Sequence, residues 1–375
     1  MTILTTLFLS AALTALGILI LVKSSLSRLF LDALDKPNAM HQVPVPRIGG
    51  LPMLLTVALV VFATLPVSHN LPASVAVSAA VCLGLFSLMD DRQGLPPYVR
   101  LVAHIVAAIV VVVALTSEAM RGAQMASELS SLLSSPLGLA VAILGLVWVT
   151  NLYNFMDGAN GLAGFMGLIG FGTLAVAAHG AMDASTVAEV TRQIESVATL
   201  CAATSGACAG FLVFNFPSGR IFMGDVGAVF LGFLAGAIGL VGAIQAVWPW
   251  WLPLLVFSPF ILDATVTLLR RMLRRERIWV AHRQHLYHRL ILHCGWSHQR
   301  TALTYAAVML LACSHGLWVM SRSAQNSVQS DTLPMAILIA WVLIYVSLFT
   351  AAEWHVRQRE LTKTNMSSKK DQGVR

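Results

Sequence analysis

Residues 226–245 read VGAVFLGFLAGAIGLVGAIQ, a stretch with no charged side chain. At 1.5 Å per residue, a helix of this length spans the roughly 30 Å hydrocarbon core of a bilayer. Similar apolar runs recur along the whole chain. They are continuous rather than alternating, which is not the pattern of a β-barrel. The stretch therefore predicts one span of a helical membrane protein.

The composition indicates a chain embedded in lipid along most of its length. Of its 375 residues, 57% are hydrophobic and only 11% are charged, whereas soluble domains carry roughly 25% charged residues. The formal net charge of +7 then reports basic loops rather than a nucleic-acid surface. The five cysteines form no CxxC pair, so neither a disulfide framework nor a zinc site is indicated.

We expect an all-α polytopic membrane helix bundle with about eleven transmembrane helices. Residues 1–355 form one membrane domain in this interpretation, and residues 356–375 form a basic cytoplasmic tail. The expected helices cover residues 2–22, 48–66, 71–89, 98–116, 136–153, 161–179, 196–214, 226–245, 249–269, 300–320 and 332–351.

The basic residues predict the orientation of the bundle. If the N-terminus lies outside, all 24 Lys and Arg residues except Arg121, Arg192 and Arg322 fall in cytoplasmic segments. Cytoplasmic loops of membrane proteins carry such an excess of basic residues. We therefore expect the N-terminus outside and the C-terminus in the cytoplasm. The same assignment places the polar clusters described next on the cytoplasmic face.

Acidic residues stand at two predicted helix ends. Asp90 and Asp91, in SLMDDRQG, repel each other at a membrane boundary unless a cation or a basic group is near. The alternative is a simple helix-end charge beside Arg92. Asp225, in FMGDVGAV, precedes an apolar helix and is either an N-terminal cap or an oxygen ligand for Mg²⁺.

The segment NLYNFMDGANGLAG, at residues 151–164, carries polar side chains at helical spacing. Asn151, Asn154 and Asp157 lie within about 60° of one another on a helix. That face would offer amide groups and one carboxylate at the membrane edge. The alternative is a helix C-terminus capped by glycine.

Histidines recur every three residues in the largest cytoplasmic loop, as His282, His285 and His288, with Arg283 and Arg289 between and after them. No carboxylate or cysteine stands close by in the sequence, so an anion clamp for phosphate oxygens is favoured over a zinc site. The five arginines between positions 270 and 277 fit topogenic or lipid-headgroup roles.

Two more groups of polar residues are candidates. The loop LDKPNAMHQVPVPRIGG carries Lys36, His41 and Arg47. Asp263 lies within an apolar span, where an acid is either functional or paired with a nearby polar group.

The chain resembles the polyprenyl-phosphate N-acetylhexosamine-1-phosphate transferases. The matching pieces are DKPNAMHQVPVPRIGG, the DD at Asp90, NLYNFMDGANGLAG, NFPSGRIFMGD and AHRQH, in the order of that family. Each piece is weak alone, but five in order are specific. The HRQH form at His282 looks like the WbpL branch rather than the triple-histidine form of MraY. This favours O-antigen or a similar polysaccharide over the peptidoglycan precursor.

The resemblance implies a reaction at the cytoplasmic face of the bacterial inner membrane. Undecaprenyl phosphate would attack the β-phosphate of a UDP-N-acetylhexosamine, and UMP would leave. The resemblance further implies Mg²⁺, or Mn²⁺ in its place, bound by Asp225, with Asp91 as a second candidate ligand. Asp90 would act as base on the lipid phosphate or orient it. The implied catalytic residues are Asp90, Asp91, Asp157, His282, Arg283 and His285, and the implied substrate-binding residues are Lys36, His41, Arg47, Asn151, Asn154 and Asn160.

The sequence departs from the family pattern at Asn160, where members often carry an acid, and at Ala39-Met40, where many carry a polar or basic pair. A polytopic transporter of an anionic substrate and a non-catalytic scaffold are the competing interpretations. A transporter should carry its polar residues near the midplane on repeated helices, and no internal repeat is evident. A homodimer is compatible with the sequence, which leaves the oligomeric state open.

Overall fold

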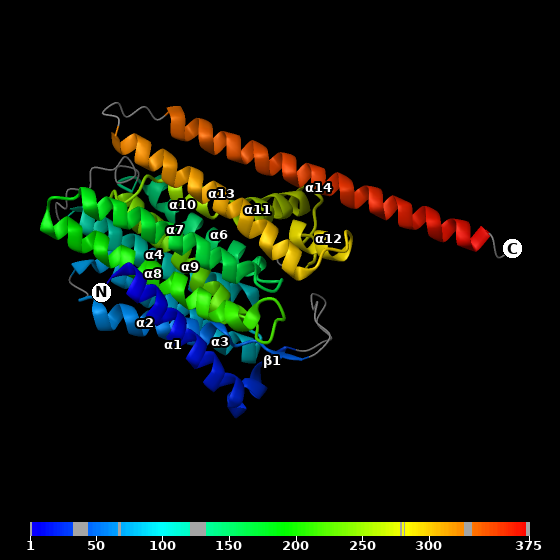
Figure 1. Ribbon diagram of the computed structural model, residues 1–375, viewed down its shortest axis with the longest axis horizontal. Coiled ribbons are helices and arrows are strands. Elements are labelled where there is room, and N and C mark those ends of the chain that lie inside the picture. The colour runs from blue at the N-terminus through cyan, green and yellow to red at the C-terminus, as the bar shows by residue number, and fades with distance from the viewer. Residues whose placement is uncertain are drawn as a thin grey trace.

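Long helices run side by side through the computed structural model, and the two ends of the chain lie at opposite ends of the bundle (Figure 1). The structure describes residues 2–32, 44–66, 69–120, 133–277, 280, 282–325 and 332–372. The predicted all-α membrane bundle is confirmed. Its membrane sidedness stays a prediction.

The elements follow the apolar runs of the sequence closely. In chain order they are α1 (Ile3–Lys23), the 3₁₀ helix η1 (Ser25–Phe30), β1 (Leu31–Asp32), β2 (Val45–Pro46), α2 (Gly50–Thr64), α3 (Leu71–Gln93), α4 (Pro97–Met120), α6 (Pro136–Phe155), α7 (Leu162–Ala184), α8 (Ala188–Asn215), α9 (Gly224–Ile244), α10 (Trp251–Val256), α11 (Ser258–Leu273), α12 (Leu286–Leu292), α13 (His298–Gln325) and α14 (Thr332–Gln372).

Among the described residues, nine helices are long and apolar enough to cross a membrane. The two other predicted spans differ from expectation. The span at 48–66 is the shorter helix α2, of 15 residues. The span at 249–269 is divided into α10, of 6 residues, and α11, of 16 residues. Helix α14 continues through the boundary predicted at residue 356, which stays a prediction.

Proline explains the break between α10 and α11. Pro259 has no N–H to donate to the carbonyl of Leu255, four residues earlier, so the helix cannot continue regularly. The hydroxyl of Ser258 donates to that carbonyl instead, at 2.5 Å. In lipid a freed backbone carbonyl needs such a substitute partner. The predicted span is therefore two separate helices, α10 and α11.

Burial separates a central helix from a peripheral one. In the apolar 18-residue stretch of α9, 89% of the residues are buried inside the protein. In that of α14 only 11% are buried. Helix α9 packs against α3 and α6, and α1 packs against α8. Asp225 stands in the first turn of this central helix, so the best-packed part of the core positions its backbone.

Backbone contacts hold the segment after β2 against the start of α9. Gly49 donates its N–H to the carbonyl of Phe222, and Gly50 donates to Met223, both at 2.8 Å. A β-carbon at Gly50 would overlap the backbone of Gly227, so only glycine permits this approach. Strands β1 and β2 form a two-residue antiparallel pair beside it.

Candidate active site

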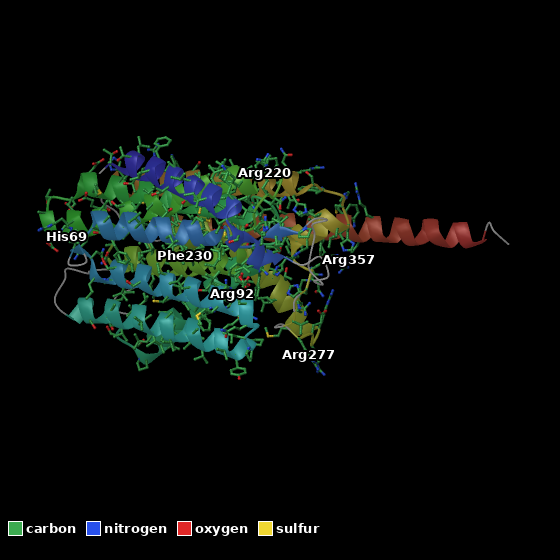
Figure 2. The ribbon with its side chains drawn as sticks, turned by 90° about the horizontal axis from the view of Figure 1, so that it is seen from below. His69, Arg92, Arg220, Phe230, Arg277 and Arg357 are labelled. Atoms are coloured by element: carbon green, nitrogen blue, oxygen red, sulfur yellow. The ribbon has the colours of Figure 1, made fainter. Side chains whose placement is uncertain are left out.

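Charged side chains gather toward one end of the bundle. Figure 2 shows His69 at one end and Arg92, Arg220, Arg277 and Arg357 toward the other. The loops that follow α3, α6, α8 and α11 lie at that second end. The structure thus brings together sequence clusters that lie far apart in the chain.

Arg47 and Asp225 form an ion pair at this end. The Nη2 of Arg47 lies 2.5 Å from Oδ1 of Asp225, whose side chain is 13% exposed. Asp225 stands in the first turn of α9, but α9 has no side-chain cap. The capping alternative is therefore not what this carboxylate does. Its charge faces a cation and retains oxygen lone pairs for a further ligand.

Asp157 lies close to this ion pair. Helix α6 ends at Phe155, so Asp157 stands in the following loop rather than on the predicted helical stripe. Burial raises the pKa of the Asp157 carboxyl to about 8; the nearby Arg47 guanidinium opposes this shift, and Asp225 adds to it. The last carbonyls of α6 have no partners within the helix, and α6 ends where the glycine-rich loop begins. Asp157 is therefore a mostly protonated carboxyl at pH 7, close to the charges of Arg47 and Asp225.

Asn151 and Asn154 stand in the last turns of α6. The Nδ2 of Asn151 donates to the carbonyl of Val147 at 2.7 Å and lies 3.3 Å from Nδ1 of His104, on α4. Asn154 is half-buried and accepts the N–H of Asp157 at its backbone carbonyl, at 3.3 Å. The amides thus flank the loop that carries Asp157.

Asp90 is buried and already has partners. Its Oδ1 accepts the N–H of Leu95 at 2.7 Å, and its Oδ2 lies 2.6 Å from Nε of Arg100. These contacts hold the turn between α3 and α4. Asp91 is exposed on the last turn of α3. The two neighbouring acids therefore have different environments, with Asp90 fixed and Asp91 facing outward.

The segment that carries the three histidines, residues 282–288, packs against the loop after α6. We name it the histidine loop. Tyr287 donates its hydroxyl to the carbonyl of Phe155 at 3.1 Å. A β-carbon at Gly158 would overlap that hydroxyl oxygen. Position 158, next to Asp157, must therefore be glycine for Tyr287 to make this contact.

The histidines of this loop stack on one another. The rings of His282 and His285 lie 4.8 Å apart, and Tyr287 and His288 lie 4.0 Å apart. Burial lowers the pKa of His282 to about 4 and that of His288 to about 3, and the nearby guanidinium groups of Arg271 and Arg283, respectively, add to these shifts. Both rings are neutral at pH 7. The positive charge of an anion clamp here comes from Arg283, which is half-buried.

Asp263 has a structural pairing. It accepts N–H groups from Leu286 at 2.9 Å and Tyr287 at 3.4 Å, and the hydroxyl of Tyr305 at 2.6 Å. Nδ1 of His285 lies 3.7 Å from it. Of the two alternatives for this acid, the structure shows the pairing: Asp263 satisfies the unpaired donors at the start of α12.

The structure describes only one of the three remaining predicted site residues, Asn160. Lys36 and His41 lie outside the described residues. The Nδ2 of Asn160 donates to the carbonyl of Pro217 at 3.2 Å, and its backbone N–H donates to Nδ1 of His298 at 3.3 Å. Asn160 therefore links two loops, and an acid at this position would lose the amide donor.

The sequence interpretation missed three residues that hold the site together, His104, Arg100 and Tyr287. His104 and Arg100 lie one turn apart on α4 and contact Asn151 and Asp90, respectively. Their signal was present, because polar side chains within a membrane helix are candidates by default. Tyr287 carries no comparable signal, whereas Asn215 is the first residue of the polar segment NFPSGRIFMGD. Asn215 joins two loops by accepting from the N–H of Gly161 at 2.6 Å and donating to the carbonyl of Ile221 at 2.8 Å.

The donor set fits a magnesium ion better than a fully protein-ligated metal. Within the described part of the chain, no three His, Cys, Asp or Glu side chains lie close enough together to hold a metal. Mg²⁺ is commonly bound by one or two carboxylates, with water and substrate phosphate completing its shell. Asp225, with Asp157 nearby, offers oxygen ligands of this kind.

Comparisons with known proteins point in one direction. A family model described as Glycosyl transferase family 4 matches residues 73–243. A Bacillus subtilis protein named probable undecaprenyl-phosphate N-acetylglucosaminyl 1-phosphate transferase is 27% identical over 90% of this chain and 88% of its own length. A Mycobacterium tuberculosis decaprenyl-phosphate N-acetylglucosaminephosphotransferase is 29% identical over 75% of this chain and 74% of its own.

A third relative is the phospho-N-acetylmuramoyl-pentapeptide-transferase of Levilactobacillus brevis, 27% identical over 73% of this chain and 84% of its own length. None of these relatives is named as a transporter, so that alternative has no support. Three of the motifs, the DD at Asp90, NLYNFMDGANGLAG and NFPSGRIFMGD, lie inside residues 73–243, and each stands at or next to a helix end in the structure. By these matches the chain is similar to the polyprenyl-phosphate N-acetylhexosamine-1-phosphate transferases, and its residues 73–243 match glycosyl transferase family 4.

Proposed function

We propose that this protein transfers an N-acetylhexosamine 1-phosphate from a UDP-sugar to undecaprenyl phosphate at the cytoplasmic face of a bacterial inner membrane. The product starts O-antigen or a related cell-envelope polysaccharide. The observation that carries the proposal is the Arg47–Asp225 ion pair beside Asp157, at the end of the bundle where the loops meet. Carboxylates and a guanidinium at one site suit the binding of a metal–pyrophosphate.

In the proposed reaction an oxygen of the lipid phosphate attacks the β-phosphorus of the UDP-sugar. The bond from that phosphorus to the bridging oxygen breaks, and UMP leaves with the electron pair. We favour direct attack over an aspartyl intermediate, because a lipid phosphate is already an anionic nucleophile that needs mainly positioning and charge screening. Bound Mg²⁺ would supply that screening of the pyrophosphate.

We assign the roles of the residues from their surroundings. Asp225, with Asp91 as a second candidate, would bind the metal, and Asp157 would lie beside it. Asp90, fixed by Leu95 and Arg100, would orient the lipid phosphate.

The remaining roles concern the nucleotide-sugar. Arg283 would pair with its phosphate oxygens, and the rings of His282 and His285 would offer hydrogen bonds to phosphate or sugar. Asn151 and Asn154 would shape the nucleotide pocket, together with Arg47.

Purified protein in detergent tests the proposal directly. It is incubated with undecaprenyl phosphate, Mg²⁺ and each of a panel of radioactive UDP-N-acetyl sugars, and UMP and lipid-linked sugar are quantified. We expect equimolar UMP and lipid product with at least one sugar, and loss of both with EDTA. Failure with every sugar, while the protein stays folded, would contradict the proposal. UDP-sugar uptake into vesicles without lipid product would instead indicate a transporter.

A further inference from the structure

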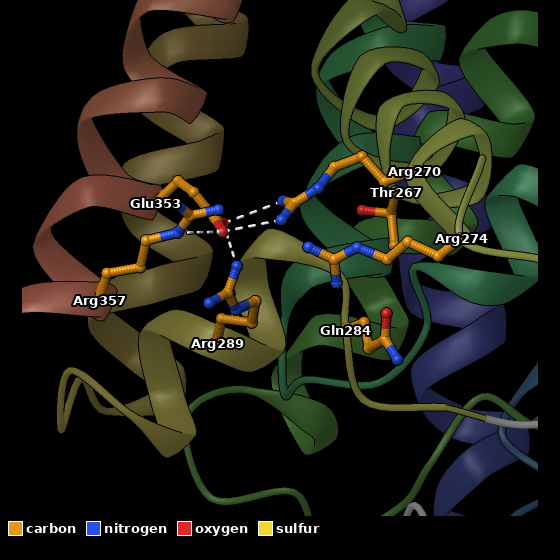
Figure 3. Close-up of a pocket in the computed structure, with 7 residues that line it drawn as sticks. All are labelled: Thr267, Arg270, Arg274, Gln284, Arg289, Glu353 and Arg357. Atoms are coloured by element: carbon orange, nitrogen blue, oxygen red, sulfur yellow. Dashed lines mark hydrogen bonds and ion pairs between the residues drawn. The ribbon is translucent and has the colours of Figure 1, made fainter. Parts of the chain in front are cut away.

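A basic pocket lies behind the histidine loop, on the side of α11 that faces α14. Figure 3 shows this pocket, a cavity of about 310 Å³. The residues that line it are Thr267, Arg270, Arg274, Gln284, Arg289, Glu353 and Arg357. We name it the arginine pocket. Four guanidinium groups and one carboxylate give it a strong excess of positive charge.

Glu353 contacts three of the four arginines of the arginine pocket. Arg270 donates to both of its carboxylate oxygens, at 3.0 and 2.8 Å. Arg289 of α12 also contacts it, and Arg357 lies 3.6 Å away. One carboxylate therefore orients three guanidinium groups from three helices and neutralises only one of them. The arrangement is a built cluster rather than a set of unrelated surface charges.

Arg274 faces the same space without contacting Glu353. In Figure 3 it points into the arginine pocket, and no interaction joins it to another residue drawn there. The neighbouring Arg271 is used differently, because it pairs with Glu276 at 3.0 Å and donates to the carbonyl of Arg277. The arginines at and just after the end of α11 thus divide into structural ones and ones aimed at the pocket. An anion placed there would meet Arg274 and Arg357 first.

An apolar groove of about 470 Å³ adjoins the arginine pocket. The same three helices line both: Val266 and Thr267 are neighbours on α11, Arg289 and Leu290 are neighbours on α12, and Phe349 and Glu353 are one turn apart on α14. The groove's lining also includes Leu262, Val308 and Tyr345. Helix α14 is the least buried of the candidate membrane spans, which leaves the groove open beside it.

We propose that the arginine pocket and the apolar groove together bind one anionic phospholipid of the surrounding bilayer. Its phosphate would contact Arg274 and Arg357, and an acyl chain would lie in the groove. A free phosphate would meet the same arginines but has no use for an apolar groove along the same helices. Charge complementarity with lipid headgroups is worth about a factor of five per basic residue near a membrane surface.

The pocket reaches the histidine loop through Gln284. That side chain lines the pocket and donates to Glu276 at 3.0 Å, and its backbone N–H donates to Nδ1 of His282 at 3.3 Å. The bound lipid would therefore stabilise the loop that carries His282 and Arg283. This site is separate from the Asp225 region and does not depend on which sugar is transferred.

Lipid retention measured by native mass spectrometry tests the inference. The full-length protein is purified from a detergent mixture with equal amounts of phosphatidylglycerol and phosphatidylcholine. We expect one phosphatidylglycerol retained in preference to phosphatidylcholine. In the double variant Arg274→Gln/Arg357→Gln its affinity should fall roughly 30-fold. The matched control Arg275→Gln, which removes an exposed charge outside the pocket lining, should retain it.

A second variant separates the lipid from a free anion. Val308→Phe would fill the groove and leave every arginine in place, so phosphatidylglycerol retention should also fall. Unchanged retention in either the double variant or Val308→Phe would overturn the proposal. Displacement of the lipid by millimolar inorganic phosphate would indicate a free-anion site and overturn it too. Stoichiometric displacement by undecaprenyl phosphate would make this the substrate pocket, which is equally contrary to the proposal.

Discussion

The Nη2 of Arg47 lies 2.5 Å from Oδ1 of Asp225, although 178 positions separate the two residues in the chain. The contact exists because Gly49 and Gly50 bind the backbone just before α9. A guanidinium in that position competes with any metal ion for the same carboxylate. It also offers positive charge to an incoming phosphate.

Replacing Arg47 with glutamine should therefore have two opposite effects. Asp225 becomes free, so the Mg²⁺ concentration for half-maximal thermal protection should fall by about an order of magnitude. Sugar-phosphate transfer should fall, because the substrate phosphate loses a cation. Thermal-shift titrations with Mg²⁺ and a transfer assay measure the two effects. Arg220→Gln removes an exposed charge at the same end and should change neither; an unaltered Mg²⁺ requirement in the Arg47 variant would argue against competition.

Asp225→Asn keeps the shape of the side chain and removes its charge. We expect Mg²⁺-dependent transfer to fall by about 10²-fold or more, because a carboxylate ligand is lost where phosphoryl charge must be screened. Size-exclusion behaviour should remain normal. Asp183→Asn, at an exposed position at the end of α7, is the control and should retain full transfer. Near-normal turnover in the Asp225 variant would remove this residue from the metal site.

Asp90→Asn should lower turnover more than it lowers UDP-sugar affinity. The amide oxygen can still accept the N–H of Leu95, so the turn after α3 should stay folded. The charge beside Arg100 is lost, and with it the proposed contact to the lipid phosphate. Turnover and a calorimetric Kd for the UDP-sugar separate the two effects. If Arg100→Gln, which keeps the carboxylate, reduces turnover equally, then the ion pair matters and the role at the lipid phosphate does not.

The sequence predicts the helices well because lipid leaves few alternatives for a long apolar run. The division of the span at 249–269 was also open to prediction, since Pro253 and Pro259 stand within it. It was missed because the hydropathy alone continues through the break. Apolar length identifies a span, whereas the backbone donors and acceptors decide whether the span is one helix.

The partners within the site are less predictable than its members. Asp157, Asp225 and the histidine loop carry visible polar patterns, but no pattern tells that Tyr287 seats against Gly158. Asp263 illustrates the same limit, because its partners Leu286, Tyr287 and Tyr305 stand more than twenty positions later in the chain. Sequence spacing shows which residues share one face of a single helix. Pairings between helices depend on packing, which single-chain periodicity does not contain.

Acid should destabilise the histidine loop. His282 and His288 have folded pKa values of about 4 and about 3, below the ordinary value of 6.5. A group with a lowered histidine pKa binds fewer protons when folded, so stability is present above pH 6.5 and is lost as pH falls toward 4. At pH 5 the loss is at most about 2 kcal/mol for each histidine.

Thermal unfolding in detergent at pH 7.5 and pH 5 measures this loss. The Tm should fall at pH 5, and His282→Gln should reduce the size of the fall because one titrating ring is removed. His179→Gln, at an exposed position on α7, should leave the fall unchanged. An identical fall in the His282 variant and the wild-type protein would show that this ring does not carry the pH dependence.

Gly158→Ala should displace the histidine loop without touching a charged residue. The new β-carbon would overlap the hydroxyl oxygen of Tyr287, and that overlap forces Tyr287 and the start of α12 outward. We expect transfer to fall at least about tenfold, mainly through a higher KM for the UDP-sugar, because Arg283 moves with the loop. Tyr287→Phe removes the clashing oxygen, so the double variant should recover part of the lost affinity even though its phenyl ring cannot donate to the carbonyl of Phe155. Gly145→Ala, where nothing lies within 4 Å of the added carbon, controls for a general effect of alanine on α6. If Gly158→Ala and its double variant are equally impaired, the defect arises in the loop after α6 itself and not in its contact with the histidine loop.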